Sequence, residues 1–192
     1  MKKIKIFTYS CLMLSVLFSC ASKKATVKAV GDVEITLPCS DFQNDKDYFR
    51  ASQMGTSPDI SSSIKTAEAN TKRSLAGQIK TQIKDVTKIY SQDRNISDTR
   101  EFSDKVETYT LAVINETLRE LNPVCKKTTQ KTNGEGEISY NTFMAYECSK
   151  DVIYNGIKKT LSNDQKLRQD YDEIKFKEVF DKEMDKLEKE QP

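Results

Sequence analysis

The chain has 192 residues, with 31 Lys and Arg against 29 Asp and Glu, and it contains no His and no Trp. Without His it has no Ser-His-Asp or Cys-His nucleophile system, no imidazole metal ligand and no side chain that ordinarily titrates near neutral pH. Charged residues make up 31% and apolar residues 36%, which is polar for a globular protein but too balanced in net charge for an intrinsically disordered one.

The first twenty residues carry the strongest signal in the sequence. Three lysines among the first five residues precede an apolar run over 6–18, which is too short for a stable membrane helix but typical of a signal-peptide core. The run ends in Leu17-Phe18-Ser19-Cys20, which resembles the bacterial lipobox, where Cys is the acylation site. We therefore expect export, removal of residues 1–19 and lipidation of Cys20. The alternative is an ordinary secretory signal with an incidental Cys.

Removal of residues 1–19 changes the charge balance. That segment holds Lys2, Lys3 and Lys5 and no acidic residue, so the remaining 173 residues carry 28 basic and 29 acidic groups. Nucleic-acid binding thereby loses its electrostatic basis. Membrane attachment would come instead from palmitate-type acyl chains. Two or more such chains anchor a protein stably, because each methylene buried in the membrane contributes about 0.8 kcal/mol to the free energy of binding.

The residues directly after Cys20 bear on the membrane to which the protein is sorted. They are Ala21-Ser22-Lys23-Lys24, with neither the Asp typical of inner-membrane retention nor the acidic residues typical of surface display. We therefore expect the outer membrane, on its periplasmic face. No later stretch reaches the ~18 consecutive apolar residues that a membrane helix requires.

Two strands are predicted after a tether over residues 20–31. Residues 32–38 alternate apolar and polar side chains, with Val33, Ile35 and Leu37 on one face, and end at Pro38. Residues 47–55 indicate a second strand.

A long helix is predicted next. Ser57-Pro58-Asp59 is typical of a helix start, with Ser57 as N-cap and Pro at the first helical position. An apolar stripe with a period near 3.6 then predicts one buried face, which the break at residues 91–95 ends; it comprises Ile60, Ile64, Ala67, Thr71, Leu75, Ile79, Ile83, Val86 and Tyr90.

The apolar residues of 101–118 fit neither the helical period of about 3.6 nor the strand period of about two. Their Val, Thr, Tyr and Ile content favours an extended segment, continuing into a helical turn at residues 115–121. A β-hairpin is predicted after it, with arms over 123–131 and 138–148 and a Gly-rich turn at 133–136, and its second arm should be the more buried.

The rest of the chain is predicted to be helical, over residues 151–160 and, after a break at 162–164, over 165–189. The last helix has an apolar stripe that either packs on the same domain or binds a partner or a second copy; it comprises Leu167, Tyr171, Ile174, Val179, Phe180, Met184 and Leu187. The i,i+4 pairs Glu173/Lys177 and Glu178/Lys182 would stabilise this helix slightly.

Four segments and one fold class follow from these patterns. They are a signal peptide (1–19), a tether (20–31), an α+β domain (32–160) and a C-terminal amphipathic helix (161–192). The expected fold class is α+β, with a small, mostly antiparallel sheet packed on one long helix.

Three cysteines remain after Cys20. Cys125 and Cys148 lie on the two hairpin arms, and a bridge between them would stabilise by roughly 3 kcal/mol. Their register is slightly offset, however, and Cys39 is the rival partner; three reduced thiols are the other possibility. A metal site is not expected, because three widely spaced thiolates without His are poor zinc ligands.

Several motifs together resemble the LPP-type twenty-kilodalton bacterial lipoprotein family. They are the lipobox, Asp47-Tyr48-Phe49-Arg50-Ala51 with Gly55-Thr56-Ser57, the helix segment 67–76, and the strand from Tyr140 to Cys148. The resemblance spans residues 47–149 and implies an envelope-anchored lipoprotein of β-α-β-β type, without catalytic residues. Some members are compared with dodecins, which stack flavin on Trp; this chain has no Trp, so no cofactor is expected.

The sequence thus predicts a lipid-anchored cell-envelope protein without enzymatic activity. It would act through a protein partner or self-association, using a sheet edge or the C-terminal helix. The alternative is a binding module for peptidoglycan or lipid, which requires a pocket between the long helix and the sheet. A hydrolase is the least favoured class, because no motif indicates one.

Overall fold

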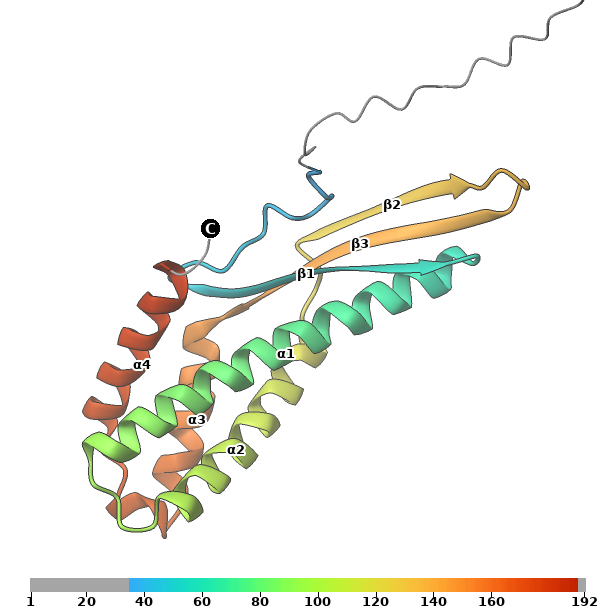
Figure 1. Cartoon of the computed structure of the whole chain (residues 1–192). Helices are drawn as coiled ribbons and strands as arrows, with labels where there is room; N and C mark the ends of the chain where they lie inside the picture. Colours follow the sequence, from blue (N-terminus) through green and yellow to red (C-terminus); the bar gives the residue numbers. More distant parts are fainter. Residues whose placement is uncertain (1–34, 190–192) are drawn as a thin grey trace, which may run out of the picture. The chain divides into compact units, whose positions relative to one another are not determined.

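The structure, a computed structural model, describes residues 35–189, which follow the order β1-α1-α2-β2-β3-α3-η1-α4 (Figure 1). The three strands form one antiparallel sheet, and the α+β class predicted from the sequence is confirmed. The signal peptide, Cys20, the tether and residues 32–34 lie outside the described residues. The strand predicted over 32–38 is wrong where it can be checked, because residues 35–38 are coil and turn.

The sheet has the order β1-β3-β2, with the hairpin strand β3 in the centre. The strands span Tyr48–Ser57 (β1), Cys125–Thr132 (β2) and Ile138–Ser149 (β3). Gly136, at φ 86°, adopts the left-handed backbone that the hairpin turn requires. The predicted hairpin is confirmed, and its second arm is the more buried: half of the twelve residues of β3 are buried, whereas β2 is exposed apart from the half-buried Cys125.

Helix α1 (Ile60–Asp93) is the long predicted helix. Its N-cap is Asp59 rather than Ser57, since the Asp59 carboxylate accepts a 2.7 Å hydrogen bond from the Ser62 N–H. The predicted stripe is buried from Ala67 to Tyr90. Its first member, Ile60, is exposed, and Ser63 takes the buried position.

The first half of α1 lies along the sheet, and the second half lies among the other helices (Figure 1). Gly55 of β1 makes the first contact possible: a Cβ there would lie 2.3 Å from the Ala67 nitrogen and 2.4 Å from the Ser63 oxygen. The sheet and α1 thus meet backbone against backbone, which only glycine allows.

Helix α2 (Thr99–Glu120) corrects the prediction of an extended segment over 101–118. Its buried residues recur every fourth position, as on one face of a helix; they are Phe102, Val106, Thr110, Ile114 and Leu118. Thr110 belongs to this buried row, and its hydroxyl donates to the Val106 carbonyl, so its polar atom is satisfied within the helix.

Helix α3 (Lys150–Asn163) follows β3 directly, and a 3-10 turn, η1 (Leu167–Gln169), separates it from α4 (Glu173–Lys189). A continuous helix from residue 165 is therefore wrong. The two predicted ion pairs do not form either: Glu173 pairs with Lys158 at 2.5 Å, and Glu178 with Lys175 at 2.7 Å.

The stripe of α4 is part of the core. Phe176, Phe180 and Met184 are buried where α4 packs on α1, and the rings of Phe176 and Phe180 contact Tyr154 of α3. Ile174, which was predicted in the stripe, is 72% exposed. The Tyr90 hydroxyl donates to the Asp170 carbonyl at 2.7 Å and accepts from the Asp172 N–H at 2.6 Å. Helix α4 is therefore held within the domain by both packing and polar contacts.

Candidate functional site

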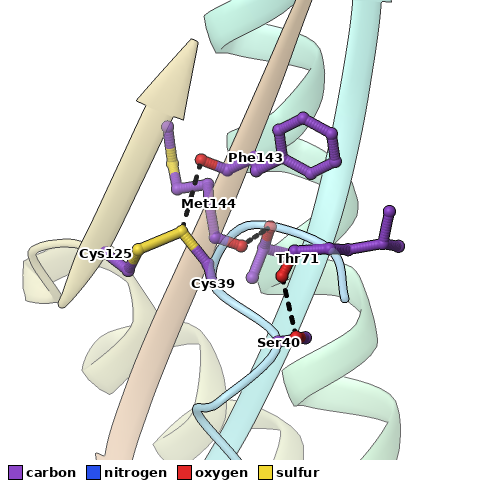
Figure 2. Close-up of a disulfide and its surroundings, with 7 residues drawn as sticks. Cys39, Ser40, Thr71, Cys125, Phe143 and Met144 are labelled. Atoms are coloured by element: carbon purple, nitrogen blue, oxygen red, sulfur yellow. Dashed lines mark hydrogen bonds between the residues drawn. A yellow bond between two sulfur atoms is a disulfide. The ribbon is translucent and has the colours of Figure 1, made fainter. Parts of the chain in front are cut away.

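The cysteines pair differently from the first expectation. Cys39 forms a disulfide with Cys125, and the predicted Cys125–Cys148 bridge is wrong (Figure 2). The reason is register: Cys125 lies opposite Ala145, and Cys148 is three residues further along β3. Side chains alternate between the two faces of a strand, so Cys125 and Cys148 point to opposite sides of the sheet.

Cys148 is a buried free thiol. It lies in the core between the sheet and α1, and burial raises its pKa to about 11. The thiolate is the reactive form of cysteine, so Cys148 is inert at neutral pH.

The disulfide holds residues 36–47, here called the strap, against the face of the sheet that is turned away from α1, here called the outer face. Cys39 adopts a left-handed backbone at φ 64° and is buried with Phe143 and Ala145, and Phe42 packs beside them. Its Sγ lies 3.8 Å from the Phe143 carbonyl oxygen (Figure 2). The strap therefore covers the centre of the outer face.

The β1 edge of the sheet is closed by side chains and by the strap. The Arg50 N–H donates to the Asn44 side chain, and the Asp45 N–H donates to the Tyr48 carbonyl. On the α1 side, the Asn70 side chain donates a 3.0 Å hydrogen bond to the Met54 carbonyl. The edge backbone of β1 is thus occupied at three points.

The β2 edge is open by comparison. Cys125 is half-buried, and the other seven residues of β2 are exposed. Its three lysines, Lys126, Lys127 and Lys131, form no ion pair within residues 35–189, and β2 contains no acidic residue. We call Cys125–Thr132 the β2 edge: an eight-residue strand whose outward hydrogen-bonding side and three lysines have no partner within residues 35–189.

A groove of about 550 Å³ lies between α1 and α2 and is called the α1–α2 groove. Its floor consists of small polar side chains, among them Thr87, Ser91 and Thr110, whose hydroxyls donate to carbonyls of their own helices at 2.7 Å. The floor hydroxyls already have these partners, so they offer little to orient a ligand.

Charged side chains of both signs line the rim of the α1–α2 groove. Lys80 pairs with Glu107 at 2.8 Å, and this hydrogen bond, reinforced by the charges of Lys80 and Lys84, lowers the pKa of Glu107. Lys84 and Lys88 form no ion pair among the described residues. The rim therefore has two lysines available for an anionic group.

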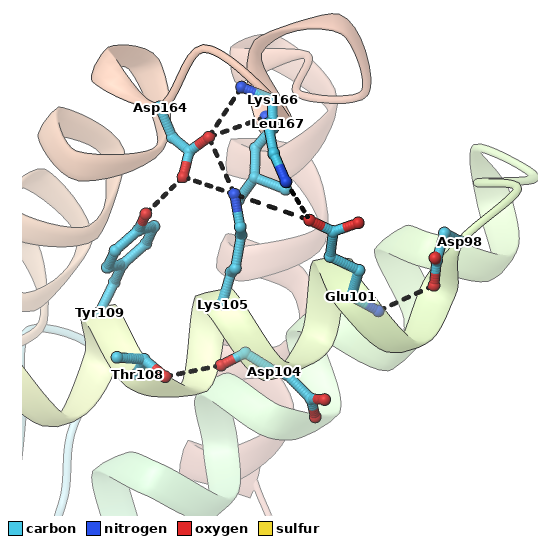
Figure 3. Close-up of polar contacts among 9 residues, drawn as sticks. All are labelled: Asp98, Glu101, Asp104, Lys105, Thr108, Tyr109, Asp164, Lys166 and Leu167. Carbon is cyan, nitrogen blue, oxygen red and sulfur yellow. Dashed lines mark hydrogen bonds and ion pairs between the residues drawn. The ribbon is translucent and has the colours of Figure 1, made fainter.

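A third polar cluster surrounds Asp164, between α3 and η1 (Figure 3). Its carboxylate accepts from the Tyr109 hydroxyl, from the Lys105 ammonium at 2.9 and 3.1 Å, and from the N–H groups of Lys166 and Leu167. These bonds, first that of Tyr109 and then that of Lys105, hold the pKa of Asp164 far below its usual range. Such a carboxylate stays ionised and joins α2 to the α3–η1 turn.

The carboxylates whose pKa is shifted are all held in the ionised form. A carboxyl group that acts as a general acid near neutral pH needs a raised pKa, whereas the pKa is lowered in each described carboxylate with a resolved shift, namely Asp45, Asp59, Glu107 and Asp164. Within residues 35–189, no three Cys, Asp or Glu side chains are grouped to hold a metal ion.

The sequence prediction named a sheet edge without saying which one, and it missed the α1–α2 groove. The groove depends on α2 being a helix, and the openness of the β2 edge depends on the strand order. The lysines of residues 126–131 were a sequence signal for an open β2 edge, because lysine is typical of edge strands.

No family model, curated protein or solved structure matches this chain. None of the described helices is long and apolar enough to span a lipid bilayer.

Proposed function

We propose that the protein is a lipid-anchored component of the bacterial cell envelope, without catalytic activity, that acts by binding a protein partner at its β2 edge. The observation that supports this function is the contrast between the two sheet edges. The β1 edge is closed by Asn44, Asp45 and Asn70, whereas the β2 edge presents eight residues with three lysines that form no ion pair in the part of the chain that the structure describes.

The second proposed route to a partner, the stripe of the C-terminal helix, is already used inside the domain. Phe176, Phe180 and Met184 are buried where α4 packs on α1. An interaction through α4 would have to expose these side chains, at a cost of about 1.5–3 kcal/mol each. The sheet edge needs no such rearrangement.

The element order supports the proposed kinship with LPP-type lipoproteins. A strand, a long helix and a hairpin that pairs with the strand are what the resemblance implies, and β1, α1 and β2–β3 follow this order. Helix α2 is inserted before the hairpin, and α3 and α4 follow it. The signal peptide and the acylated Cys20 of the proposal rest on the sequence.

The anchoring is tested by Cys20→Ala in the intact chain, expressed in a bacterium with a lipoprotein-processing pathway. Loss of the acylation site should move the protein from the membrane pellet to the soluble fraction. Cys11→Ala is the matched control, because it removes a cysteine from the same segment upstream of the lipobox. Sedimentation of Cys20→Ala with membranes in the absence of detergent would contradict acyl anchoring.

A second candidate function is the binding of an envelope ligand such as a peptidoglycan fragment. The α1–α2 groove is the observation that favours it, since Lys84 and Lys88 are available there for a carboxylate or phosphate. At Gly55 the long helix and the sheet meet backbone against backbone, so this position leaves no room for the expected pocket between them. Titration of soluble muropeptides into the protein and into Lys84→Ala/Lys88→Ala, followed by calorimetry, tests this function.

A further inference from the structure

We infer that the β2 edge receives an extended, acidic segment of a partner protein as a fourth strand of the sheet. This inference rests on the proposed function and specifies its contact: the site is the side of β2 that faces away from β3, and the occupant is a peptide segment with Asp or Glu at alternate positions. Strand addition of this kind draws its affinity from backbone hydrogen bonds and its selectivity from side chains on the two faces.

The first argument is the availability of the backbone. An edge strand directs half of its N–H and C=O groups away from its neighbour, and these groups are a template for another chain. On β1 such groups are occupied by the Asn44 and Asn70 side chains. Within residues 35–189, no hydrogen bond of this kind reaches the side of β2 that faces away from β3, and the strand is long enough for a typical five- or six-residue partner.

The second argument is charge. Lys127 and Lys131 lie opposite Phe143 and Ser139 and therefore point to the outer face, whereas Lys126 lies opposite Met144 and points to the α1 side. A docked strand would meet cations on both of its faces. Acidic residues directly across from lysines are favourable cross-strand pairs.

The same charges argue against a second copy of this chain as the occupant. Pairing of two β2 edges would place a strand with three lysines and no acidic residue against an identical one. Like charges opposite one another in a sheet are destabilising, and lysine on an edge strand is a common means of preventing self-association. An acidic partner removes this repulsion, so the lysines select against self-pairing and for a complementary segment.

The remaining positions of β2 fit a strand template. Thr128, Thr129 and Thr132 are β-branched residues that favour the extended backbone. The Thr128 hydroxyl is 3.0 Å from that of Thr142, which in turn is 2.8 Å from the Ser63 hydroxyl, so this part of the strand is fixed to β3 and α1. A rigid edge reduces the ordering cost of binding.

The test is site-specific photo-crosslinking in intact cells with the full chain. The crosslinking residue replaces Thr129, which is exposed in the middle of the β2 edge, and, in a separate strain, Lys88 of the α1–α2 groove. We expect an adduct from position 129, and mass spectrometry should map it to a segment of net negative charge in another envelope protein.

Two charge-reversal variants make the test specific. Lys126→Glu/Lys127→Glu/Lys131→Glu should reduce the adduct about tenfold or more, because it places like charges across the new strand pair. Lys65→Glu/Lys159→Glu/Lys182→Glu changes the net charge equally at exposed positions on α1, α3 and α4 and should leave the adduct intact. Both variants should keep the urea midpoint of the parent, since all six lysines are exposed.

Each other outcome overturns the inference in a distinguishable way. An adduct with a second copy, with a phospholipid, or with a segment that is not acidic means that the β2 edge has a different occupant. An adduct that both variants retain equally means that the lysines do not select it. An adduct from position 88 alone leaves a binding function but moves it to the α1–α2 groove, and no adduct from either position removes the proposed partner as well.

Discussion

Loss of the Cys39–Cys125 disulfide should destabilise the domain strongly. The bridge closes a loop with a sequence separation of 86 residues that contains β1, α1 and α2. On the loop-entropy estimate, a bridge over this separation removes conformational entropy from the unfolded chain worth about 4.6 kcal/mol at 25 °C. A domain of this size has a free energy of unfolding of roughly 5–15 kcal/mol, so the loss is a large part of the total.

The magnitude can be measured with the chain that begins at residue 20 and carries Cys20→Ala. Cys39→Ala/Cys125→Ala in that chain should lower the free energy of urea unfolding by about 4–5 kcal/mol and the melting temperature by roughly 9–18 °C. The dependence on urea should become steeper, because the unbridged unfolded chain exposes more surface. Addition of a reductant to the parent should reproduce most of the loss without any change in side chains.

The buried thiol supplies the control. Cys148→Ala keeps the Cys39–Cys125 bridge, so it should show the same drop in stability upon reduction as the parent, starting from a slightly lower value because a buried side chain is shortened. A loss below about 1 kcal/mol in the double variant would refute the loop-entropy reasoning. Insensitivity of Cys148→Ala to reductant would show that Cys148, and not Cys39, is the partner of Cys125.

Two further predictions concern the packing and the polar contacts. Gly55→Ala should destabilise the domain by about 2 kcal/mol or more, because its Cβ would overlap the α1 backbone. Gly77→Ala, at a position of α1 with open space around the added Cβ, should instead stabilise the domain by up to about 1 kcal/mol. Urea unfolding measures both variants, and equal effects would contradict the close approach of Gly55 to α1. Asp164→Asn should lower the melting temperature at pH 7, and the deficit should shrink as the pH falls below about 4. The sign follows from the lowered pKa in the folded state: the ionised Asp164 stabilises the fold above the unfolded-state pKa, and protonation removes this contribution. Melting curves of both proteins from pH 7 to pH 2 measure it, and a deficit independent of pH would mean that the carboxylate charge is not involved.

The elements that the sequence predicts correctly are those in which the buried residues recur at one regular spacing. The stripe of α1 repeats every three or four residues over most of its length, and the hairpin arms are separated by a Gly-rich turn, so local patterns suffice for both. Helix α2 shows where the approach fails. Its composition favours strand, but its buried row recurs every fourth residue and includes Thr110, which a search for apolar residues alone does not count. Packing against α1 and α3 decides the conformation there.

The disulfide could be predicted in part. Once the hairpin turn is placed at residues 133–137, Cys125 and Cys148 are an odd number of positions out of register, which sets them on opposite faces. That argument excludes their bridge from sequence alone. It does not identify Cys39 as the partner, because the strap across the outer face depends on the left-handed turn at Cys39 and on the burial of Phe143 and Ala145.

The two proposals and the disulfide are consistent with one mechanical role. Cys39 follows the proposed anchor at Cys20 in the chain and is covalently joined to Cys125, the first residue of the β2 edge. A pull between an anchored N-terminus and a partner strand on β2 would therefore pass through the S–S bond and a few residues of β2. It would bypass β1, α1 and the helical core. If the anchor and the partner strand are as proposed, a pull between them would not act on the non-covalent contacts that keep β1, α1 and the helical core folded.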